Sequence, residues 1–234
     1  MNIVIILASG LGRRMKRDKN KVFLTINRKP IIWYAVEAFE RSKKIDSIII
    51  TSKQGDLKSM QELVKKYKWK KVRGIIKGGR ERQDSAYAGL KFAFQKKSLK
   101  KDDVLIFHNG ANPFVTSAEI NAVIEAAKNY GAAAVAHPTK DTIKEVNEKM
   151  EVKQTLDRSK LWNMQTPQAI IASLALRAFE WAEKEKFIGT DDISLVEKIG
   201  KKTVVVLASE NNFKITNPLD LALAKIIIKK QKDV

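Results

Sequence analysis

The chain opens with a short apolar run that ends at two closely spaced glycines. Residues 3–7 are continuously apolar, Gly10 and Gly12 follow, and a polar tract then extends to Lys21. A short apolar run bounded by glycine is typical of a buried β-strand that leads into a tight loop. Glycine also permits backbone angles and close ligand contacts that larger residues exclude. The stretch therefore predicts a buried first strand followed directly by a ligand-binding loop.

This loop is strongly cationic. Its positively charged residues are Arg13, Arg14, Lys16, Arg17, Lys19 and Lys21. The backbone N–H groups of a glycine turn, together with several cations, suit a polyphosphate. The whole chain has 45 Lys and Arg against 26 Asp and Glu, a net charge of +19, which also favours anionic partners. Lysine-rich runs elsewhere are typical of solvated faces.

The rest of the chain alternates apolar runs with segments of helical periodicity. Further strands are expected at 45–51, 72–76, 104–107, 132–136, 166–171 and 204–207. Helices are expected at 31–41, 57–67, 80–94, 117–129 and 173–184, near 192, and from Pro218 onward. We expect Ser117, and the pair Asp191 and Asp192, to cap their helices. The alternation predicts right-handed βαβ units in an α/β, Rossmann-like fold with a mostly parallel sheet and helices on both faces.

The loops richest in Gly, Asn and charged residues all follow predicted strands. They span residues 8–21, 78–85, 108–114 and 208–216. Ligands of parallel α/β sheets bind beyond the C-terminal ends of the strands, so these loops are expected to meet at one rim. The chain shows no internal repeat or linker, which predicts a single domain over 1–234. Only the segment at about 137–163 breaks the alternation, as an arm outside the main body would.

Several classes of protein are excluded by what the sequence lacks. It has no cysteine, so disulfides, thiolate metal sites and thiol catalysis are absent. No apolar run has the length of a membrane span, and no charged segment precedes the first strand as in a signal peptide, so a cytoplasmic location is expected. The dinucleotide fingerprint fails because Met15 stands where its third small residue belongs, and the P-loop Gly-Lys-Ser/Thr pattern is missing.

The ordered series of motifs resembles one enzyme family. The motifs are Gly10-x-Gly12-x-Arg14 with Lys21, Gly78-Gly79-Arg80-Glu81-Arg82-Gln83-Asp84-Ser85, the loop from His108 to Phe114, Gln165-Thr166-Pro167-Gln168, Thr190-Asp191-Asp192, and Phe213-Lys214-Ile215-Thr216. In this order and spacing they are similar to the 2-C-methyl-D-erythritol 4-phosphate cytidylyltransferase family of sugar-phosphate nucleotidyltransferases. Ribitol-5-phosphate cytidylyltransferases look similar, so the polyol phosphate stays open.

The resemblance implies a reaction and its catalytic residues. A phosphate oxygen of the polyol phosphate attacks the α-phosphorus of CTP and releases pyrophosphate, which for the methylerythritol enzymes is a step of isoprenoid-precursor synthesis in the non-mevalonate pathway. Arg14 and Lys21 would neutralise the phosphates and the transition state, with Lys214 on the opposite side. Such catalysis depends on positioning and charge stabilisation rather than on a covalent intermediate.

The resemblance also implies binding residues. Those for the nucleotide are Ala8, Ser9, Gly10, Gly12, Gly79, Arg82 and Ser85. Those for the polyol phosphate are Thr142, Arg158 and Asn112, with Thr142 and Arg158 on an arm that crosses to the partner subunit of a homodimer. Two alternatives stay open: Ser85 as an ordinary residue of a helix start, and Arg158 in a salt bridge with Asp157 or Glu151.

The chain departs from the family pattern at the expected metal site. Asn109 and Asn211 stand where the family carries the aspartates that bind Mg²⁺, a role Mn²⁺ can also take, and Asn112 replaces an arginine. Asn20 stands where proline is frequent. Hard cations prefer carboxylate oxygens over neutral amides. Three readings follow: turnover with the metal held mainly by the nucleotide, nucleotide binding with weak or no turnover, or a different polyol phosphate.

A function of another class, nucleic-acid binding, rests only on the net charge. The sequence has neither interleaved aromatic residues for base stacking nor a helix-turn-helix signal, so nucleic acid is disfavoured as a partner. His108 and His137 have no nearby partner of the kind a catalytic histidine needs. Both are expected to be structural hydrogen-bonding residues.

Overall fold

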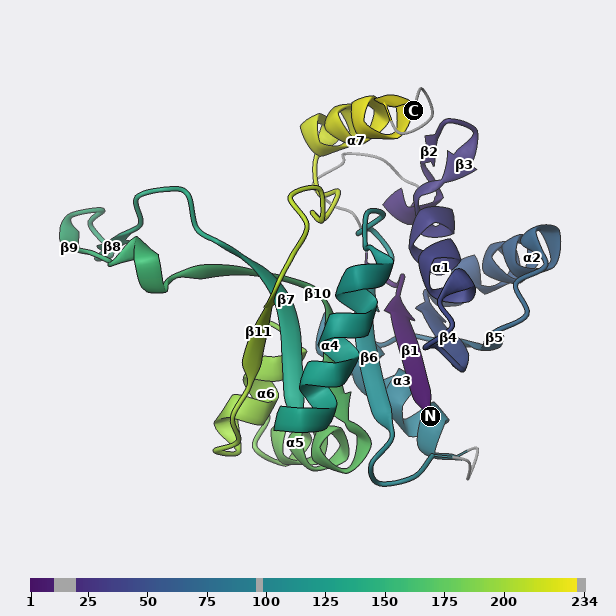
Figure 1. Cartoon of the computed structure of the whole chain (residues 1–234), viewed down its shortest axis with the longest axis horizontal. Helices are drawn as coiled ribbons and strands as arrows, with labels where there is room; N and C mark the ends of the chain where they lie inside the picture. Colours follow the sequence, from purple (N-terminus) through teal and green to yellow (C-terminus); the bar gives the residue numbers. More distant parts are fainter. Residues whose placement is uncertain (11–19, 96–98, 231–234) are drawn as a thin grey trace.

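The computed structural model describes residues 1–10, 20–95 and 99–230. Their main feature is a seven-stranded sheet in the order β11-β7-β10-β6-β1-β4-β5 (Figure 1). The strands are β1 (Asn2–Leu7), β4 (Ser47–Ser52), β5 (Val72–Lys77), β6 (Val104–Asn109), β7 (Ala132–Pro138), β10 (Trp162–Ile171) and β11 (Val204–Leu207). Only β10 runs antiparallel to its neighbours β6 and β7, so the predicted mostly parallel sheet is confirmed.

Helices cover both faces of this sheet. They are α1 (Ile31–Arg41), α2 (Leu57–Tyr67), α3 (Arg82–Gln95), α4 (Ser117–Tyr130), α5 (Ala172–Lys184) and α6 (Asp192–Lys198). The last helix, α7 (Pro218–Lys230), instead packs on a separate apolar cluster with Ile26 and Ile215. The buried side chains of α1, α2 and α4 share one apolar core, and those of α3, α5 and α6 share another. Among the described helices, none is both long enough and apolar enough to cross a lipid bilayer.

The opening apolar run lies at the centre of the molecule because it supplies both cores. Val4 and Ile6 of β1 pack on the face of α1 and α4. Ile3, Ile5 and Leu7 pack on the opposite face, against α3 and α5. A strand buried on both sides has no polar face, which explains why its sequence is continuously apolar.

Element boundaries differ from the sequence-based expectation in a few places. The helix expected from Arg80 begins at Arg82, and α4 is capped by Thr116 rather than Ser117. Thr116 Oγ1 accepts a hydrogen bond from Glu119 N at 3.2 Å, while Glu119 Oε2 accepts one from Thr116 N at 2.7 Å. This reciprocal capping box satisfies two donors at the helix start, which Ser117 could not do from inside the helix.

A hairpin projects from the sheet where the alternation of strands and helices breaks. It consists of β8 (Lys144–Val146) and β9 (Val152–Thr155), and a short helical turn, η4 (Arg158–Lys160), follows it. Figure 1 shows it far from the sheet, beyond the ends of β7 and β10. Every residue of β8 and β9 is exposed, which is unusual for a β-hairpin of a single chain.

Candidate functional site

A cavity of about 490 Å³ opens at the C-terminal rim of the parallel strands. Its wall includes Ser9 and Gly10 after β1, Arg82 at the start of α3, Asn109 at the end of β6, and Lys214 after β11. Each of the four loops identified in the sequence thus contributes to one cavity. The predicted convergence is confirmed, for the reason that parallel strands present their C-terminal ends at the same edge.

The wall of this cavity is predominantly cationic. Among its described residues, Lys21, Arg80, Arg82 and Lys214 carry positive charge and Glu81 carries negative charge. Four fixed cations around a concave surface attract polyanions, and a low-dielectric wall strengthens that attraction. The arrangement suits the triphosphate of a nucleotide better than a neutral metabolite.

Lys21 is placed at the cavity by the residue before it. Asn20 is buried, and its Nδ2 donates to the carbonyl oxygen of Ala8 at 2.7 Å and to Asp56 Oδ2 at 3.0 Å. Its Oδ1 accepts from Val22 N at 3.3 Å and caps the short helix η2 (Lys21–Phe23). Proline, frequent here in the family, has no side-chain amide for these bonds, so the asparagine ties the end of the loop back to β1.

Ser85 joins two of the loops instead of facing the cavity. It is fully buried, and its Oγ lies 2.7 Å from Ser9 Oγ and accepts from Gly79 N at 3.1 Å. A side chain without exposed surface does not contact a ligand, so the predicted direct nucleotide contact of Ser85 is not supported by this geometry. Its contacts fix Ser9 and Gly79, both of which were also expected at the nucleotide site.

Packing requires glycine in the loop at 78–79, but it does not require glycine at Gly10. A Cβ at Gly79 would lie 2.1 Å from Asp84 Cβ, and one at Gly78 would lie 2.7 Å from Ser9 Cβ. At Gly10, which lines the cavity, an added Cβ would meet no heavy atom within 4 Å. The space in front of Gly10 is therefore open, and glycine there leaves the backbone accessible from the cavity.

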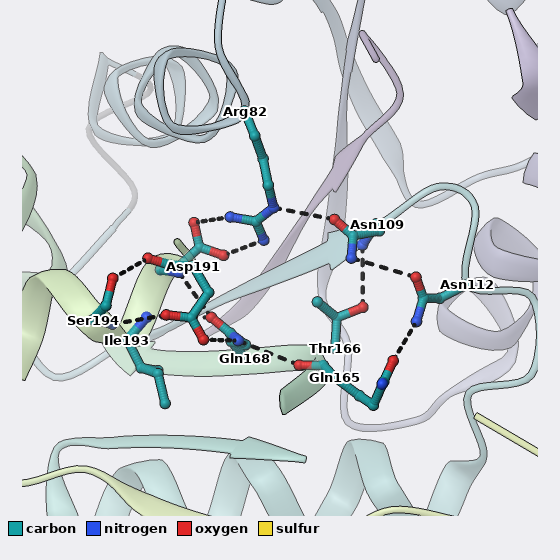
Figure 2. A network of polar contacts seen from close by, with 10 residues as sticks. Arg82, Asn109, Asn112, Gln165, Thr166, Gln168, Asp191, Ile193 and Ser194 are labelled. Atoms are coloured by element: carbon teal, nitrogen blue, oxygen red, sulfur yellow. Dashed lines mark hydrogen bonds and ion pairs between the residues drawn. The ribbon is translucent and has the colours of Figure 1, made fainter. Parts of the chain in front are cut away.

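Arg82 is held in a fixed orientation by two side chains. Figure 2 shows it between α6 and the end of β6. Its Nη1 and Nη2 donate to the two carboxylate oxygens of Asp192 at 2.9 and 2.5 Å, and its Nε donates to Asn109 Oδ1 at 3.2 Å. Burial opposes the charge, but the attraction of Asp192, its hydrogen bonds and the attraction of Asp191 together outweigh it and raise the pKa of Arg82. Three of five N–H donors are thus used, and the plane of the guanidinium is set.

The two aspartates before α6 have different roles. Asp191 is the helix cap, since its Oδ1 accepts from Ser194 N at 3.0 Å, as predicted. Asp192 forms the ion pair with Arg82 and is almost completely buried. Gln168 of β10 holds this region, because its Oε1 accepts from Asp192 N at 2.9 Å and its Nε2 donates to Asp191 Oδ2 at 2.8 Å (Figure 2).

Asn112, which is expected to bind substrate, is a buried residue. Its side chain has no exposed surface. Asn112 Oδ1 accepts from Asn109 Nδ2 at 3.3 Å, and its Nδ2 lies 3.4 Å from Gln165 Oε1 and from Asn212 Oδ1 (Figure 2). An amide can pair with other amides in this way, whereas the arginine of the family would carry charge into the same space. Asn112 belongs to the structure beneath the cavity wall.

The residues present do not fit a divalent cation held by the protein. Asn109 Oδ1, the oxygen that would face a metal, already accepts from Arg82 Nε. Asn211 is exposed and does not line the cavity, while its neighbour Asn212 is the buried member of the pair. In the part of the chain that the structure describes, no three His, Asp or Glu side chains are grouped as a metal site requires.

The remaining predicted residues lie away from the cavity or outside the described part. Thr142 and Arg158 are exposed near the projecting hairpin and do not line the cavity. Arg158 Nη1 donates to the carbonyl oxygen of Lys140 at 3.3 Å, while Asp157 pairs with Lys160, so the alternative ion pair with Asp157 is not formed. Gly12 and Arg14 fall within 11–19, outside the described residues.

His108 is a structural residue, as predicted. Its ring is fully buried, Nε2 donates to the carbonyl oxygen of Asn112 at 3.0 Å, and Nδ1 has no partner. A second proton would place an N–H at Nδ1 without an acceptor, and burial lowers the pKa of His108 to about 4. His137, half-buried, bonds the carbonyl oxygen of Asn212 through Nε2 at 3.1 Å.

This buried imidazole predicts a pH dependence of stability. In the unfolded chain His108 binds a proton below its ordinary pKa of 6.5, whereas in the folded chain it stays neutral down to about pH 4. Acid therefore favours the unfolded state. We expect His108 to lower the free energy of unfolding by about 2 kcal/mol as the pH falls from 7.5 to 5. The free energy of unfolding, measured by urea denaturation at several pH values in this range, should change less with pH in His108→Gln than in the unaltered protein. Equal slopes for both proteins would contradict the assignment.

Several residues of this region were not assigned a site role from the sequence. Arg80 lines the cavity, Asp192 holds Arg82, and Glu119 bonds Asn212 in the segment before Lys214. Arg80 lies within a recognised motif, and Thr116-x-x-Glu119 is a capping-box pattern that the sequence displays. Nothing in the local sequence indicates that Asn212 is the buried residue and Asn211 the exposed one, because the two adjacent residues are identical.

Comparisons with known proteins agree along the whole chain. Residues 2–230 match the family model described as 2-C-methyl-D-erythritol 4-phosphate cytidylyltransferase. A protein of that name from Halalkalibacterium halodurans is 41% identical to this chain over 225 residues, which cover 96% of each chain. Another, from Clostridium acetobutylicum, is 43% identical over 231 residues, which cover 98% of each chain. The crystal structure of 4-diphosphocytidyl-2C-methyl-D-erythritol synthase from Anaerococcus prevotii has a TM-score of 0.83 at 27% identity, covering 97% of this chain and 96% of that one.

Proposed function

The chain belongs to the 2-C-methyl-D-erythritol 4-phosphate cytidylyltransferase family, and on that basis we propose that its rim cavity is where CTP and the methylerythritol phosphate react. The enzyme is a nucleotidyltransferase of the non-mevalonate route to isoprenoid precursors. The observation that carries the placement is the cavity wall with four cations, next to the open space at Gly10. The products are CDP-methylerythritol and pyrophosphate.

The proposed mechanism assigns charge stabilisation to the cations. A phosphate oxygen of the polyol phosphate attacks the α-phosphorus, the bond to the bridging oxygen of the β-phosphate breaks, and pyrophosphate leaves with the electron pair. Lys21 and Lys214 line the cavity and would stabilise the charge that builds on the α-phosphate, together with Arg14. Arg82, held by Asp192, would contact the phosphates through its remaining N–H donors. Positioning of the two phosphates supplies the rest of the rate enhancement.

Recognition of the base is proposed for backbone groups of the first glycine loop, at Ala8, Ser9 and Gly10. Gly12 and Gly79 are proposed as further nucleotide-binding residues. Ser85 supports Ser9 and Gly79 from below, because its hydroxyl contacts both. A base pocket too small for a purine would select the pyrimidine.

The polyol phosphate site is proposed to need a second subunit. Thr142 and Arg158 lie near the exposed hairpin and not in the wall of their own cavity, so they would bind substrate in the cavity of a partner chain. Arginine suits such a contact because it binds phosphate through two parallel hydrogen bonds. We therefore propose a homodimer, built from single-domain chains with the arm at about 137–163 and located in the cytoplasm.

Members of this family generally depend on a divalent metal ion. Because the residues present do not fit a carboxylate site, we propose that Mg²⁺ reaches the cavity on CTP, with Mn²⁺ as a substitute. We expect Asn109→Asp to lower the Mg²⁺ concentration needed for half-maximal activity. The exposed Asn211→Asp is the matched comparison and should change it little. An unchanged requirement in both variants would show that position 109 does not contact the metal.

A pyrophosphate-release assay tests the proposed activity. We expect turnover with CTP and methylerythritol 4-phosphate in the presence of Mg²⁺, and much lower turnover with ribitol 5-phosphate. Faster reaction with ribitol 5-phosphate would reassign the substrate. CTP binding in calorimetry without turnover on either substrate, at any Mg²⁺ or Mn²⁺ level, would leave only a nucleotide-binding protein.

A further inference from the structure

Glu119 is a buried carboxylate whose two oxygens contact different parts of the chain. Its side chain belongs to α4 and is 3% exposed. Oε2 accepts from Thr116 N at 2.7 Å and Thr116 Oγ1 at 2.8 Å, which is the helix cap. Oε1 accepts from Ser209 N at 2.8 Å and Asn212 Nδ2 at 2.9 Å, both in the segment that follows β11. All four donors are neutral, and the N-terminal end of α4 favours the negative charge.

The segment after β11 is fixed at several points around Lys214. Asn212 is fully buried, and besides Glu119 its Nδ2 donates to the carbonyl oxygen of Thr166 at 3.0 Å. On the other side of Lys214, Ile215 N donates to the carbonyl oxygen of Ala111 at 2.9 Å. Lys214, which lines the cavity, is therefore set between two anchored residues. Glu119 accepts two of the hydrogen bonds that make up the anchor on the N-terminal side of Lys214.

We propose that Glu119 is a positioning residue for Lys214. It does not line the cavity itself. It fixes the backbone from Ser209 to Asn212 and thereby sets where the side chain of Lys214 enters the cavity. The inference rests on the proposed catalytic role of Lys214, and the experiment below separates the two.

A carboxylate is required because four donors converge on one side chain. Ionised oxygens form hydrogen bonds about twice as strong as neutral ones. A glutamine in the same place has one oxygen and one NH₂ group, so its NH₂ would face donors either at the helix cap or at the loop. Glu119→Gln therefore loosens one of the two connections while keeping the size of the side chain.

The first test compares Glu119→Gln with Thr116→Val. Valine removes the hydroxyl of the cap but leaves the bonds from Glu119 to Ser209 and Asn212, so it controls for loss of helix stability. We expect Glu119→Gln to lower kcat by about 10- to 100-fold with little change in the KM for CTP. Thr116→Val should lower the melting temperature and leave kcat unchanged. An equal loss of kcat in both variants would overturn the proposal.

The second test is a double-mutant cycle with Lys214→Gln. If Glu119 acts through Lys214, then Glu119→Gln should not lower kcat further in the Lys214→Gln protein. Independent, multiplicative losses would overturn the positioning role. Full activity of Lys214→Gln alone would instead refute the proposed function of Lys214.

A second variant covers the case in which Glu119→Gln does not fold. Asn212→Asp places a carboxylate against Glu119 Oε1 and repels the loop without altering the cap of α4. The same selective loss of kcat is expected, again absent in the Lys214→Gln background. A normal kcat in Asn212→Asp would contradict the proposal.

Discussion

Replacement of Lys21 by glutamine is expected to lower kcat by about two to three orders of magnitude. Lys21 lies in the cavity wall, where on the proposed mechanism its charge would act on the negative charge that develops on the α-phosphate. Loss of one preorganised group of this kind typically has an effect of that size. Pyrophosphate release at saturating CTP and methylerythritol 4-phosphate measures it directly.

The matched control for this variant is Lys58→Gln. Lys58 is an exposed residue of α2, so its replacement removes the same charge from the chain away from the cavity. We expect its kcat to equal that of the unaltered protein. A decrease of less than threefold in Lys21→Gln, with the fold intact by circular dichroism, would remove Lys21 from the catalytic residues.

Asp192→Ala is expected to lower the free energy of unfolding by about 3 kcal/mol. The side chain of Asp192 is 1% exposed and that of Arg82 is 27% exposed, so alanine would leave a largely buried guanidinium without its carboxylate. Removing one partner of a buried pair costs about 3–5 kcal/mol, and the partial exposure of Arg82 favours the lower end. The KM for CTP should rise as well, because Arg82 loses its fixed orientation.

Urea denaturation and CTP titration of three variants test this prediction. Asp192→Asn keeps the shape and one hydrogen bond, so we expect a smaller loss of stability. Asp191→Ser keeps a helix cap at the neighbouring position and should affect the KM for CTP least. If Asp192→Ala changes stability while its KM for CTP stays normal, Asp192 supports α6 only and does not orient Arg82.

Much of the fold could be predicted because its central elements have strong local patterns. The apolar run of β1 and the helical spacing of Ile32, Val36 and Phe39 in α1 each indicate one structure clearly. The antiparallel direction of β10 could not be predicted, because strand direction depends on partners distant in the sequence. Thr116 was missed as a cap, although its pattern with Glu119 was present, since Ser117 is an equally good capping residue in isolation.

For the candidate site too, some features could be predicted from the sequence and others depend on residues distant in the chain. Ser9, Gly10, Lys21 and Lys214 could be named because the family resemblance implies them and each lies in a loop after a strand, and they do meet at the cavity. The burial of Ser85 and Asn112 could not be predicted from loop position alone. Whether a polar residue faces the cavity or the interior is decided by partners elsewhere in the chain, as for Ser85 with Ser9.

β10 connects the outlying hairpin to the interior, with an irregularity in its pairing to β7 between Met164 and Gln168. Its ten residues begin at Trp162 beside the hairpin, and pass through Thr166 and Gln168, which bond β6 and the start of α6. From Gln168 to Ile170, β10 is in regular register with both β6 and β7, and successive side chains of a strand point to opposite faces, so a one-residue insertion in this part would turn the side chains that follow it to the wrong face. A change of length in this part of β10 is therefore expected to disrupt the sheet, whereas β8 and β9 are exposed and, among the described strands, pair only with each other.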